Sequence, residues 1–251
     1  MNGKSIQGLE NRWPGLFVTG TGTGVGKTTA AAALLAAARH QGIDAAPVKP
    51  VQTGAEEHAH GRTAPDLDFC LRMSGMQPAA GLYDLMAPYR FLLPASPHLA
   101  ARVEGQRVAI EEILKACSEL AHTYRFLIAE GAGGILVPLN ERTTMIDLAV
   151  EMGFPVVVAA RPTLGTLNHT LLTLHALRGA GLSVAGVVMV ETGPKEWGAI
   201  EQDNLETIAG RGEVNILGKI PFLAGLGQSE TLPPPLLDAG LEILEALARG
   251  G

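Results

Sequence analysis

Short segments that are apolar at every position alternate along the sequence with longer segments rich in Ala and Leu, and this alternation restricts the chain to few folds. Continuously apolar strands are typical of a sheet covered on both faces, and strands that alternate with helices are joined by right-handed crossovers into a parallel sheet. The expected strands span residues 16–18, 45–51, 126–129, 156–160, 184–190 and 215–217, and the expected helices span residues 27–40, 111–122, 145–152, 166–180, 197–209 and 236–248. The sequence therefore predicts an α/β fold with a mainly parallel sheet between two layers of helices.

The chain is interpreted as a single domain over residues 16–251, preceded by a loose leader over residues 1–15 that has no periodic pattern. A length of 251 residues fits one α/β unit. Residues 52–97 are rich in Gly, Pro and His, so we expect an irregular stretch there. Loops of that length are usually functional or mobile.

Composition excludes several classes of function. A formal net charge of −6 and an aromatic content of 4% give neither the basic surface nor the stacking platforms of a nucleic-acid-binding protein. No apolar run approaches the roughly 20 residues of a membrane span, and the N-terminus has no signal-peptide pattern, so we expect a cytoplasmic protein. Cys70 and Cys117 fall in predicted helices and are expected to be buried thiols.

A glycine-rich segment, GTGTGVGKT at residues 20–28, joins the first predicted strand to the first predicted helix. In that context the backbone N–H groups and the helix N-terminus bind phosphate, the lysine reaches the β- and γ-phosphates, and the Thr hydroxyl binds Mg²⁺. The expected nucleotide-binding residues of this P-loop are Thr23, Gly24, Val25, Gly26, Lys27, Thr28 and Thr29. A dinucleotide-binding fingerprint fits worse, because Asp44 lies at the start of the next strand and not at its end. The sequence thus predicts a single-domain, P-loop NTPase-like fold that binds a nucleoside triphosphate.

Other polar side chains follow predicted strands, at the sheet edge where α/β proteins bind their ligands. Lys49 could stabilise a transferring phosphoryl group, and the alternative is a surface lysine. Glu130 could bind Mg²⁺, while Gly131 and Gly133 would let the backbone approach a ligand; the alternative is that Glu130 caps the turn. Asp66 is a second candidate metal carboxylate, although such a residue is often a helix N-cap.

A helix start at Gly165, Thr166 and Asn168 could receive a carboxylate, and the alternative is that Thr166 is only the helix cap. The histidines have no metal-binding spacing, and no Ser/Cys–His arrangement for covalent hydrolysis stands out.

Taken together, these segments resemble the dethiobiotin synthetase family. The resemblance covers most of the chain in order, and the five-residue separation of Gly20 and Gly26 is itself a family trait. The matching segments are residues 17–21, 49–51, 96–98, 104–105, 130–134, 164–165, 168–169, 172–173 and 217–221.

The resemblance implies a reaction of ATP, CO₂ and 7,8-diaminononanoate that gives dethiobiotin, ADP and phosphate, with Mg²⁺ as cofactor. It implies that Lys27 and Lys49 are the catalytic residues that stabilise phosphoryl charge. The implied Mg²⁺ ligands are Thr28, Asp66 and Glu130. Glu130, Gly131 and Gly133 are further implied nucleotide-binding residues. The implied substrate-binding residues are Thr23, Lys49, Thr53, Gly133, Gly165, Thr166 and Asn168. In the family the substrate carboxylate is held by the partner subunit, which implies a homodimer with its site at the interface.

Three departures from the family pattern matter. Thr53 replaces a Ser seen in some members, a mild change that keeps the hydroxyl. Gly22 stands where the family often has Asp, and the strand that ends near Val190 lacks the Asn that commonly reads adenine, so the base preference stays open. The alternative function is a regulatory P-loop ATPase of the MinD/ParA kind. Those proteins carry an early lysine in the loop, and no Lys occurs between Gly20 and Gly26.

Overall fold

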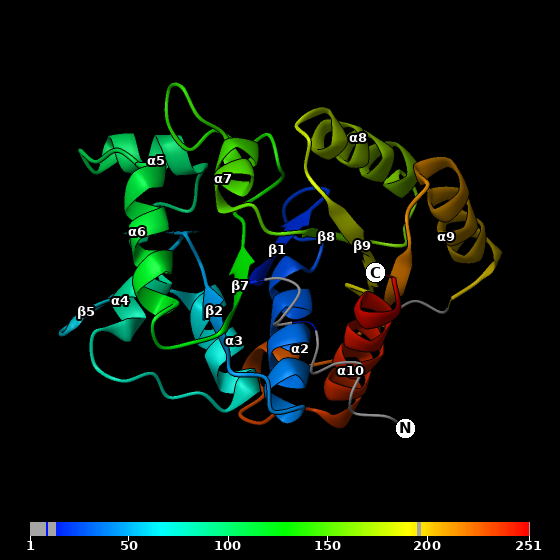
Figure 1. Ribbon diagram of the computed structural model, residues 1–251, viewed down its shortest axis with the longest axis horizontal. Helices are drawn as coiled ribbons and strands as arrows, with labels where there is room; N and C mark the ends of the chain where they lie inside the picture. The colour runs from blue at the N-terminus through cyan, green and yellow to red at the C-terminus, as the bar shows by residue number, and fades with distance from the viewer. Residues whose placement is uncertain (1–8, 10–13, 195–196, 251) are drawn as a thin grey trace.

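The computed structural model describes residues 9, 14–194 and 197–250. Six parallel strands form the central sheet in the order β10-β9-β8-β1-β7-β2 (Figure 1). The strands are β1 Gly15–Gly20, β2 Ala45–Val48, β7 Phe126–Glu130, β8 Val156–Ala160, β9 Val184–Val190 and β10 Ile216–Ile220. The predicted α/β fold with a mainly parallel sheet is confirmed.

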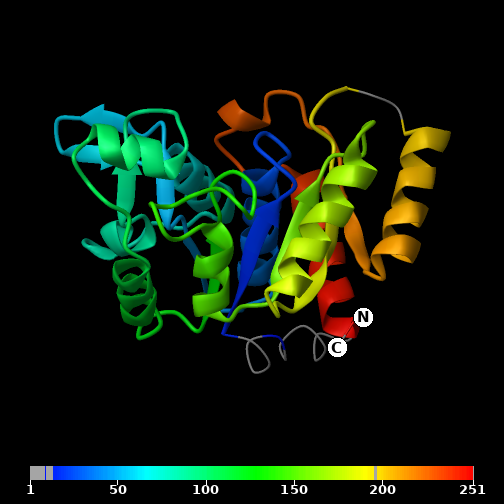
Figure 2. The ribbon, with the colours of Figure 1, turned by 90° about the horizontal axis from the view of Figure 1, so that it is seen from above.

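Helices cover both faces of this sheet (Figure 2). One layer holds α2 (Lys27–His40), α3 (Pro65–Ser74) and α10 (Pro234–Arg249), and the other holds α6 (Ile110–Leu120), α7 (Met145–Met152), α8 (Thr166–Gly179) and α9 (Ala199–Gly212). Every residue of β1, β2, β7 and β8 is buried. Burial on both faces explains why these strands are almost entirely apolar and do not alternate with polar residues.

Helix α2 packs closely against its neighbours α3 and α10 because its side chains are small. Residues 30–38, which are Ala and Leu alone, are all buried. A Cβ added to Gly240 of α10 would lie 2.2 Å from the carbonyl oxygen of Ala33, so α10 can approach α2 this closely only with Gly at that position.

The prediction of an irregular stretch at residues 52–97 is wrong. Short elements occupy it: β3 (Val51–Thr53) pairs in parallel with β6 (Tyr89–Phe91), and β4 (Glu56–His58) forms a hairpin with β5 (Gly61–Thr63). Helices α3 and α4 (Leu82–Met86) lie between β5 and β6 in the chain, and α5 (Pro97–Val103) follows β6. Buried side chains such as Leu67, Met86 and Phe91 hold these elements in the core, and such long-range packing leaves no periodic signal in short segments.

The expected strand at residues 45–51 also divides in two. β2 ends at Val48, and the N–H of Lys49 donates to the carbonyl oxygen of Met86 at 2.7 Å instead of continuing the sheet. Pro50 has no N–H to donate, and the chain then enters β3 in the smaller sheet.

Most other expected boundaries agree within a few residues, and α2 and α7 agree fully. Gly15, assigned to the leader, belongs to β1, and Leu9 is buried in the core; the remaining leader residues 1–8 and 10–13 lie outside the described part. Cys70 and Cys117 are buried and free, as predicted.

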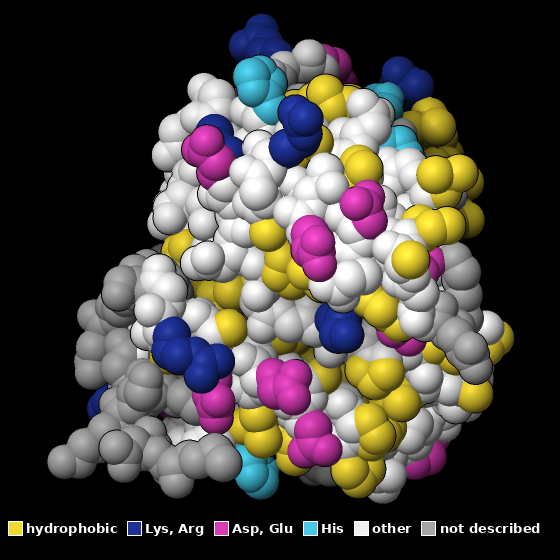
Figure 3. Space-filling model, turned by 90° about the vertical axis from the view of Figure 1, so that its right-hand side faces the viewer, with side chains coloured by type: hydrophobic (Ala, Val, Ile, Leu, Met, Phe, Trp, Pro, Cys, Tyr) yellow, Lys and Arg dark blue, Asp and Glu magenta, His cyan; other side chains and the backbone are white. Residues whose placement is uncertain are grey.

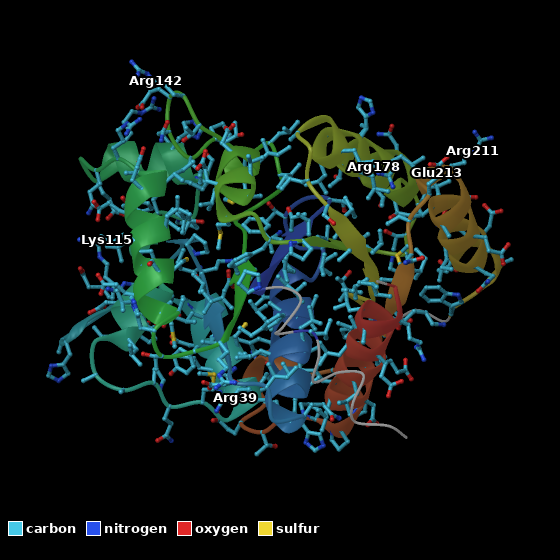
Figure 4. All side chains as sticks on the ribbon, in the orientation of Figure 1. Arg39, Lys115, Arg142, Arg178, Arg211 and Glu213 are labelled. Atoms are coloured by element: carbon cyan, nitrogen blue, oxygen red, sulfur yellow. The ribbon has the colours of Figure 1, made fainter. Side chains whose placement is uncertain are left out.

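One surface contact fixes the turn between α9 and β10. Arg178 at the end of α8 lies beside Glu213 (Figure 4), and its guanidinium donates to the carbonyl oxygens of Gly212 at 2.6 Å and Glu213 at 2.9 Å. On the face shown in Figure 3, acidic and basic side chains of the described residues are interspersed. None of the helices in the described ranges is both long enough and apolar enough to cross a membrane.

Candidate active site

A cavity of about 1080 Å³ lies at the carboxyl ends of the parallel strands. Its walls come from the P-loop and the start of α2, from β3 and α3, and from the segments that follow β7, β9 and β10. This is the edge at which ligands bind in open α/β sheets. Of the P-loop, Thr23, Gly24, Gly26, Lys27, Thr28 and Thr29 line the cavity.

The backbone of the P-loop depends on two glycines. Gly24 and Gly26 have φ angles of 71° and 93°, in the left-handed region that favours glycine. A Cβ at Gly26 would lie 2.4 Å from the side chain of Val190, so no larger residue fits there. The loop therefore presents backbone N–H groups at the start of α2, an arrangement that binds phosphate.

Lys27 is buried at the first position of α2. Its Nζ donates to the carbonyl oxygen of Gly22 at 2.7 Å, which folds the side chain back over the loop. Burial lowers the pKa of Lys27 to about 8, although the charge of Glu130 partly opposes this shift. The Lys27 ammonium therefore loses its proton at a lower pH than an ordinary lysine does, until a bound anion stabilises its charge.

A second lysine, which is buried, lies at the centre of an ionic cluster. Lys49 Nζ is 2.6 Å from Asp66 Oδ2 and 2.8 Å from Glu130 Oε1. The Thr28 hydroxyl donates to the same Glu130 oxygen at 2.8 Å. Burial alone would lower the pKa of Lys49, but the charges of Glu130 and Asp66 outweigh it and raise the pKa, so the ammonium stays charged.

This cluster excludes three of the alternatives that the sequence left open. Lys49 is 4% exposed and therefore is not a surface lysine. Asp66 is not a helix N-cap, because α3 begins after Ala64 and Asp66 is its second residue. The carboxylate of Glu130 receives hydrogen bonds from the side chains of Lys49 and Thr28, so it does not serve to cap a turn.

The donor set fits Mg²⁺. Thr28, Asp66 and Glu130 offer only oxygen atoms, which this hard cation prefers. In the described part of the chain no group of three or more His, Cys, Asp and Glu residues could hold a metal. A Mg²⁺ ion at these three residues would therefore complete its coordination with phosphate and water, as it usually does at nucleotide sites.

Other predicted residues divide into two sets. Thr53, Glu130 and Gly133 line the cavity. Val25 packs in the core, and a Cβ on Gly131 would meet Met145 and Phe17, so these two residues support the cavity from behind.

Gly165, Thr166 and Asn168 lie outside the cavity, at the start of α8. The helix N-cap is Gly165 and not Thr166. Thr166 is buried with its hydroxyl 3.3 Å from that of Thr170, whereas Asn168 is exposed. Within one chain the structure does not bring these residues to the P-loop.

The wall of the cavity opposite the P-loop contains residues that were not predicted from the sequence, on α3 and after β9 and β10. Arg72 of α3 donates to the carbonyl oxygens of Ser229 at 2.8 Å and Gly227 at 2.9 Å, which holds the loop after β10 against α3. Glu191, which follows β9, accepts from the N–H of Phe222 at 3.2 Å. The strand-end rule could have identified Glu191 and Phe222, since each follows a predicted strand, but the Arg72 contact joins residues too far apart to be read from a pattern. Gln52 was missed as well, and it also lines the cavity.

Comparisons with known proteins identify the family of the chain. A family model described as an AAA domain matches residues 14–230. The ATP-dependent dethiobiotin synthetase BioD of Anaeromyxobacter dehalogenans (strain 2CP-C) is 45% identical over 72% of this chain and 78% of its own length. The protein of the same name from Thermodesulfovibrio yellowstonii is 35% identical over 93% of this chain and 99% of its own length.

The fold has solved counterparts. MinD in the MinC:MinD cell division complex of Aquifex aeolicus aligns with a TM-score of 0.61 over 94% of each chain, at 18% identity. An identity this low shows a shared fold alone, so it gives no support to the regulatory alternative. The relatives in sequence decide the family: this chain belongs to the ATP-dependent dethiobiotin synthetases.

Proposed function

We propose that this protein is an ATP-dependent dethiobiotin synthetase, which closes a ureido ring on 7,8-diaminononanoate with CO₂. The observation that carries the proposal is the cluster beside the P-loop in which the buried Lys49 and Glu130 contact the half-buried Asp66 and Thr28. A phosphate-binding loop alone fits any nucleotide-binding protein. A second buried lysine, held charged at the cavity wall, suits a reaction in which a second anion meets the γ-phosphate.

The reaction divides into three steps. One amine of the substrate adds to CO₂ and loses a proton, which gives a carbamate. A carbamate oxygen attacks the γ-phosphorus, the bond from this phosphorus to ADP breaks, and a carbamic–phosphoric anhydride forms. The second amine then attacks the carbamoyl carbon, phosphate leaves with its oxygen, and loss of a proton completes the five-membered ring.

The protein contributes position and charge. Lys27 binds the transferring phosphoryl group from the P-loop side, and Lys49 contacts both this group and the carbamate. Thr28, Asp66 and Glu130 would hold Mg²⁺, which would supply positive charge to neutralise the phosphates. Fixing two anions in line in this way removes much of the entropic barrier to their reaction.

The substrate lies across two subunits in this proposal. Thr23, Thr53 and Gly133 line the cavity, and in this proposal they bind the diamine and the carbamate. Gly165, Thr166 and Asn168 lie outside the cavity of their own chain, and Asn168 is exposed. We infer that this helix start meets the cavity of a second copy and receives the substrate carboxylate there, in a homodimer.

Mass spectrometry of the product tests the reaction. The purified protein is incubated with the diamine, bicarbonate, Mg²⁺ and each nucleoside triphosphate separately, and the ureido product is scored. The proposal requires product that depends on all the components and disappears in Lys27→Ala. Consumption of triphosphate without any need for the diamine would overturn it.

A further inference from the structure

Helix α3, which carries Asp66, begins without a side chain of its own that caps its first N–H groups. The N-cap residue is Ala64, whose side chain has no oxygen to accept a hydrogen bond, and the first helical residue is Pro65, which has no N–H. The N–H of Asp66 is therefore the first donor of the helix that needs an acceptor. A helix start without a capping acceptor is less stable than one that has it.

Gln52 supplies the missing acceptor from β3. Its Oε1 accepts from the N–H of Asp66 at 3.2 Å, and its Nε2 donates to the carbonyl oxygen of Thr53 at 2.8 Å. The two bonds require opposite ends of the amide, so they fix its orientation. Gln52 is 4% exposed and lines the cavity, so little water is present to replace either bond.

The same segment binds Asp66 at both its ends. Lys49, three residues before Gln52, pairs with the Asp66 carboxylate, and Gln52 binds its backbone. We propose that Gln52 is a positioning residue, which caps α3 from outside the helix and so fixes the Asp66 carboxylate toward Glu130. This inference rests on the proposed function, in which Asp66 is a Mg²⁺ ligand.

The role predicts a specific defect. Gln52→Met keeps the length of the side chain and removes the acceptor, so Asp66 should be less well oriented for the metal. Loss of a group that orients a metal ligand typically weakens metal binding by about 10-fold or more. We expect the Mg²⁺ concentration for half-maximal turnover to rise about 10-fold. The KM for the diamine, measured at saturating Mg²⁺, should stay within about twofold because the metal is then bound.

A second readout needs no catalysis. ADP binding is measured by calorimetry with and without Mg²⁺, and Gln52→Met should lose most of the gain in affinity that Mg²⁺ gives the wild type. ADP binding without Mg²⁺ should not change. If Gln52→Met does not fold, Gln52→Asn, whose shorter side chain cannot span both bonds, takes its place.

Rescue distinguishes capping from a general packing role. Ala64 has the extended backbone typical of an N-cap, so Ala64→Ser can supply an acceptor oxygen within α3. The double variant Gln52→Met/Ala64→Ser should regain most of the Mg²⁺ affinity. Asn140→Leu is the matched control: this buried amide also accepts backbone N–H groups, of Arg142 and Thr143, but it does not line the cavity. It should lower the unfolding temperature and leave the Mg²⁺ dependence unchanged.

The outcomes separate the two proposals. An unchanged Mg²⁺ dependence in Gln52→Met, or a rise confined to the diamine KM, would overturn the role of Gln52 and leave the proposed function intact. A wild-type protein whose turnover and ADP binding are both indifferent to Mg²⁺ would overturn the metal site of the proposed function, and this inference with it.

Discussion

Lys49 and Glu130 form a buried ion pair, and such pairs are expensive to build. Removing two charges from water costs about as much as their attraction returns, so the pair itself adds little to stability. Removing one partner is different, because it leaves the other charge buried and uncompensated. The pair in this cavity is therefore better explained by its chemistry than by folding.

Two variants separate the contribution of this ion pair to stability from its contribution to the reaction. Lys49→Met should lower the free energy of unfolding by about 3 kcal/mol, because burial already raises the pKa of Glu130 and the opposing charge of Lys49 is lost. Lys49→Met/Glu130→Gln removes both charges and should regain most of that stability. Both variants should lose turnover by about 100-fold or more, since the charge that stabilises the phosphoryl group is gone.

Urea denaturation and the product assay measure the two effects on the same samples. A double variant that is as active as the wild type would contradict the role of Lys49. A single variant as stable as the wild type would contradict the buried pair.

The lowered pKa of Lys27 leads us to expect that nucleotide affinity depends on pH. Its pKa in the free protein is lowered to about 8, and phosphate must bind the protonated form. Bound phosphate raises this pKa, so between the two values binding takes up a proton and affinity falls as pH rises through about 8. The limiting slope is about 10-fold per pH unit.

Calorimetry at pH 8.5, in buffers of different ionisation enthalpy, counts the protons taken up when ADP binds. With a pKa of about 8 in the free protein, the expected uptake is about three quarters of a proton at pH 8.5 and falls toward zero below pH 7. Affinity that stays flat from pH 7 to pH 9.5 would show that the Lys27 ammonium is not titrating at this site.

At the scale of elements, Glu213 ends α9 with a φ of 44°, a left-handed backbone that is costly for a residue with a side chain. Glu213→Gly should therefore raise the free energy of unfolding, by about 1 kcal/mol. Glu206→Gly, at an exposed position inside the same helix, should instead lower it by about 0.5–1 kcal/mol, because Gly is a poor helix former. Thermal unfolding of the two variants gives shifts of opposite sign, and shifts of the same sign would contradict the assignment of strain to Glu213.

The elements also show what a sequence reveals. The strand, glycine-rich loop and helix around Lys27 are read directly, because their signals are local: an apolar run, two positive-φ glycines and a Lys-Thr pair at a helix start. The strand at residues 45–51 was too long, since tertiary contact and not local propensity turns the chain at Lys49.

Residues 52–97 show the limit of this reading. Gln52 caps Asp66 from 14 residues away, and Arg72 binds carbonyl groups more than 150 residues ahead. Neither contact leaves a periodic trace. The sequence thus identifies the residues that touch phosphate and leaves out those that hold them in place.

At the scale of the whole molecule, the proposed homodimer has a candidate contact face. Large apolar side chains are exposed on α7, on α8 and on the segments ahead of them: Leu136, Val150, Leu164 and Leu172. Leu164 is 94% exposed immediately before the helix start that includes Asn168. Exposed apolar groups of this kind often mark an interface.

Leu172→Glu tests this face. A charge buried at the interface should dissociate the dimer and, because the substrate site is shared, lower turnover by about 10-fold or more. Light scattering after gel filtration reports the mass. Ile200→Glu is the control, since Ile200 is equally exposed, at 59%, but lies on α9. A fully active monomer would contradict the shared site.

The central claim is that a carbamate oxygen becomes bonded to phosphorus. Single-turnover reaction with ¹⁸O-labelled CO₂ in ordinary water, followed by mass analysis of the released phosphate, measures this directly. The account predicts one ¹⁸O atom in each phosphate that accompanies a ureido product. Phosphate without the label, in a reaction that still forms the ring, would contradict it.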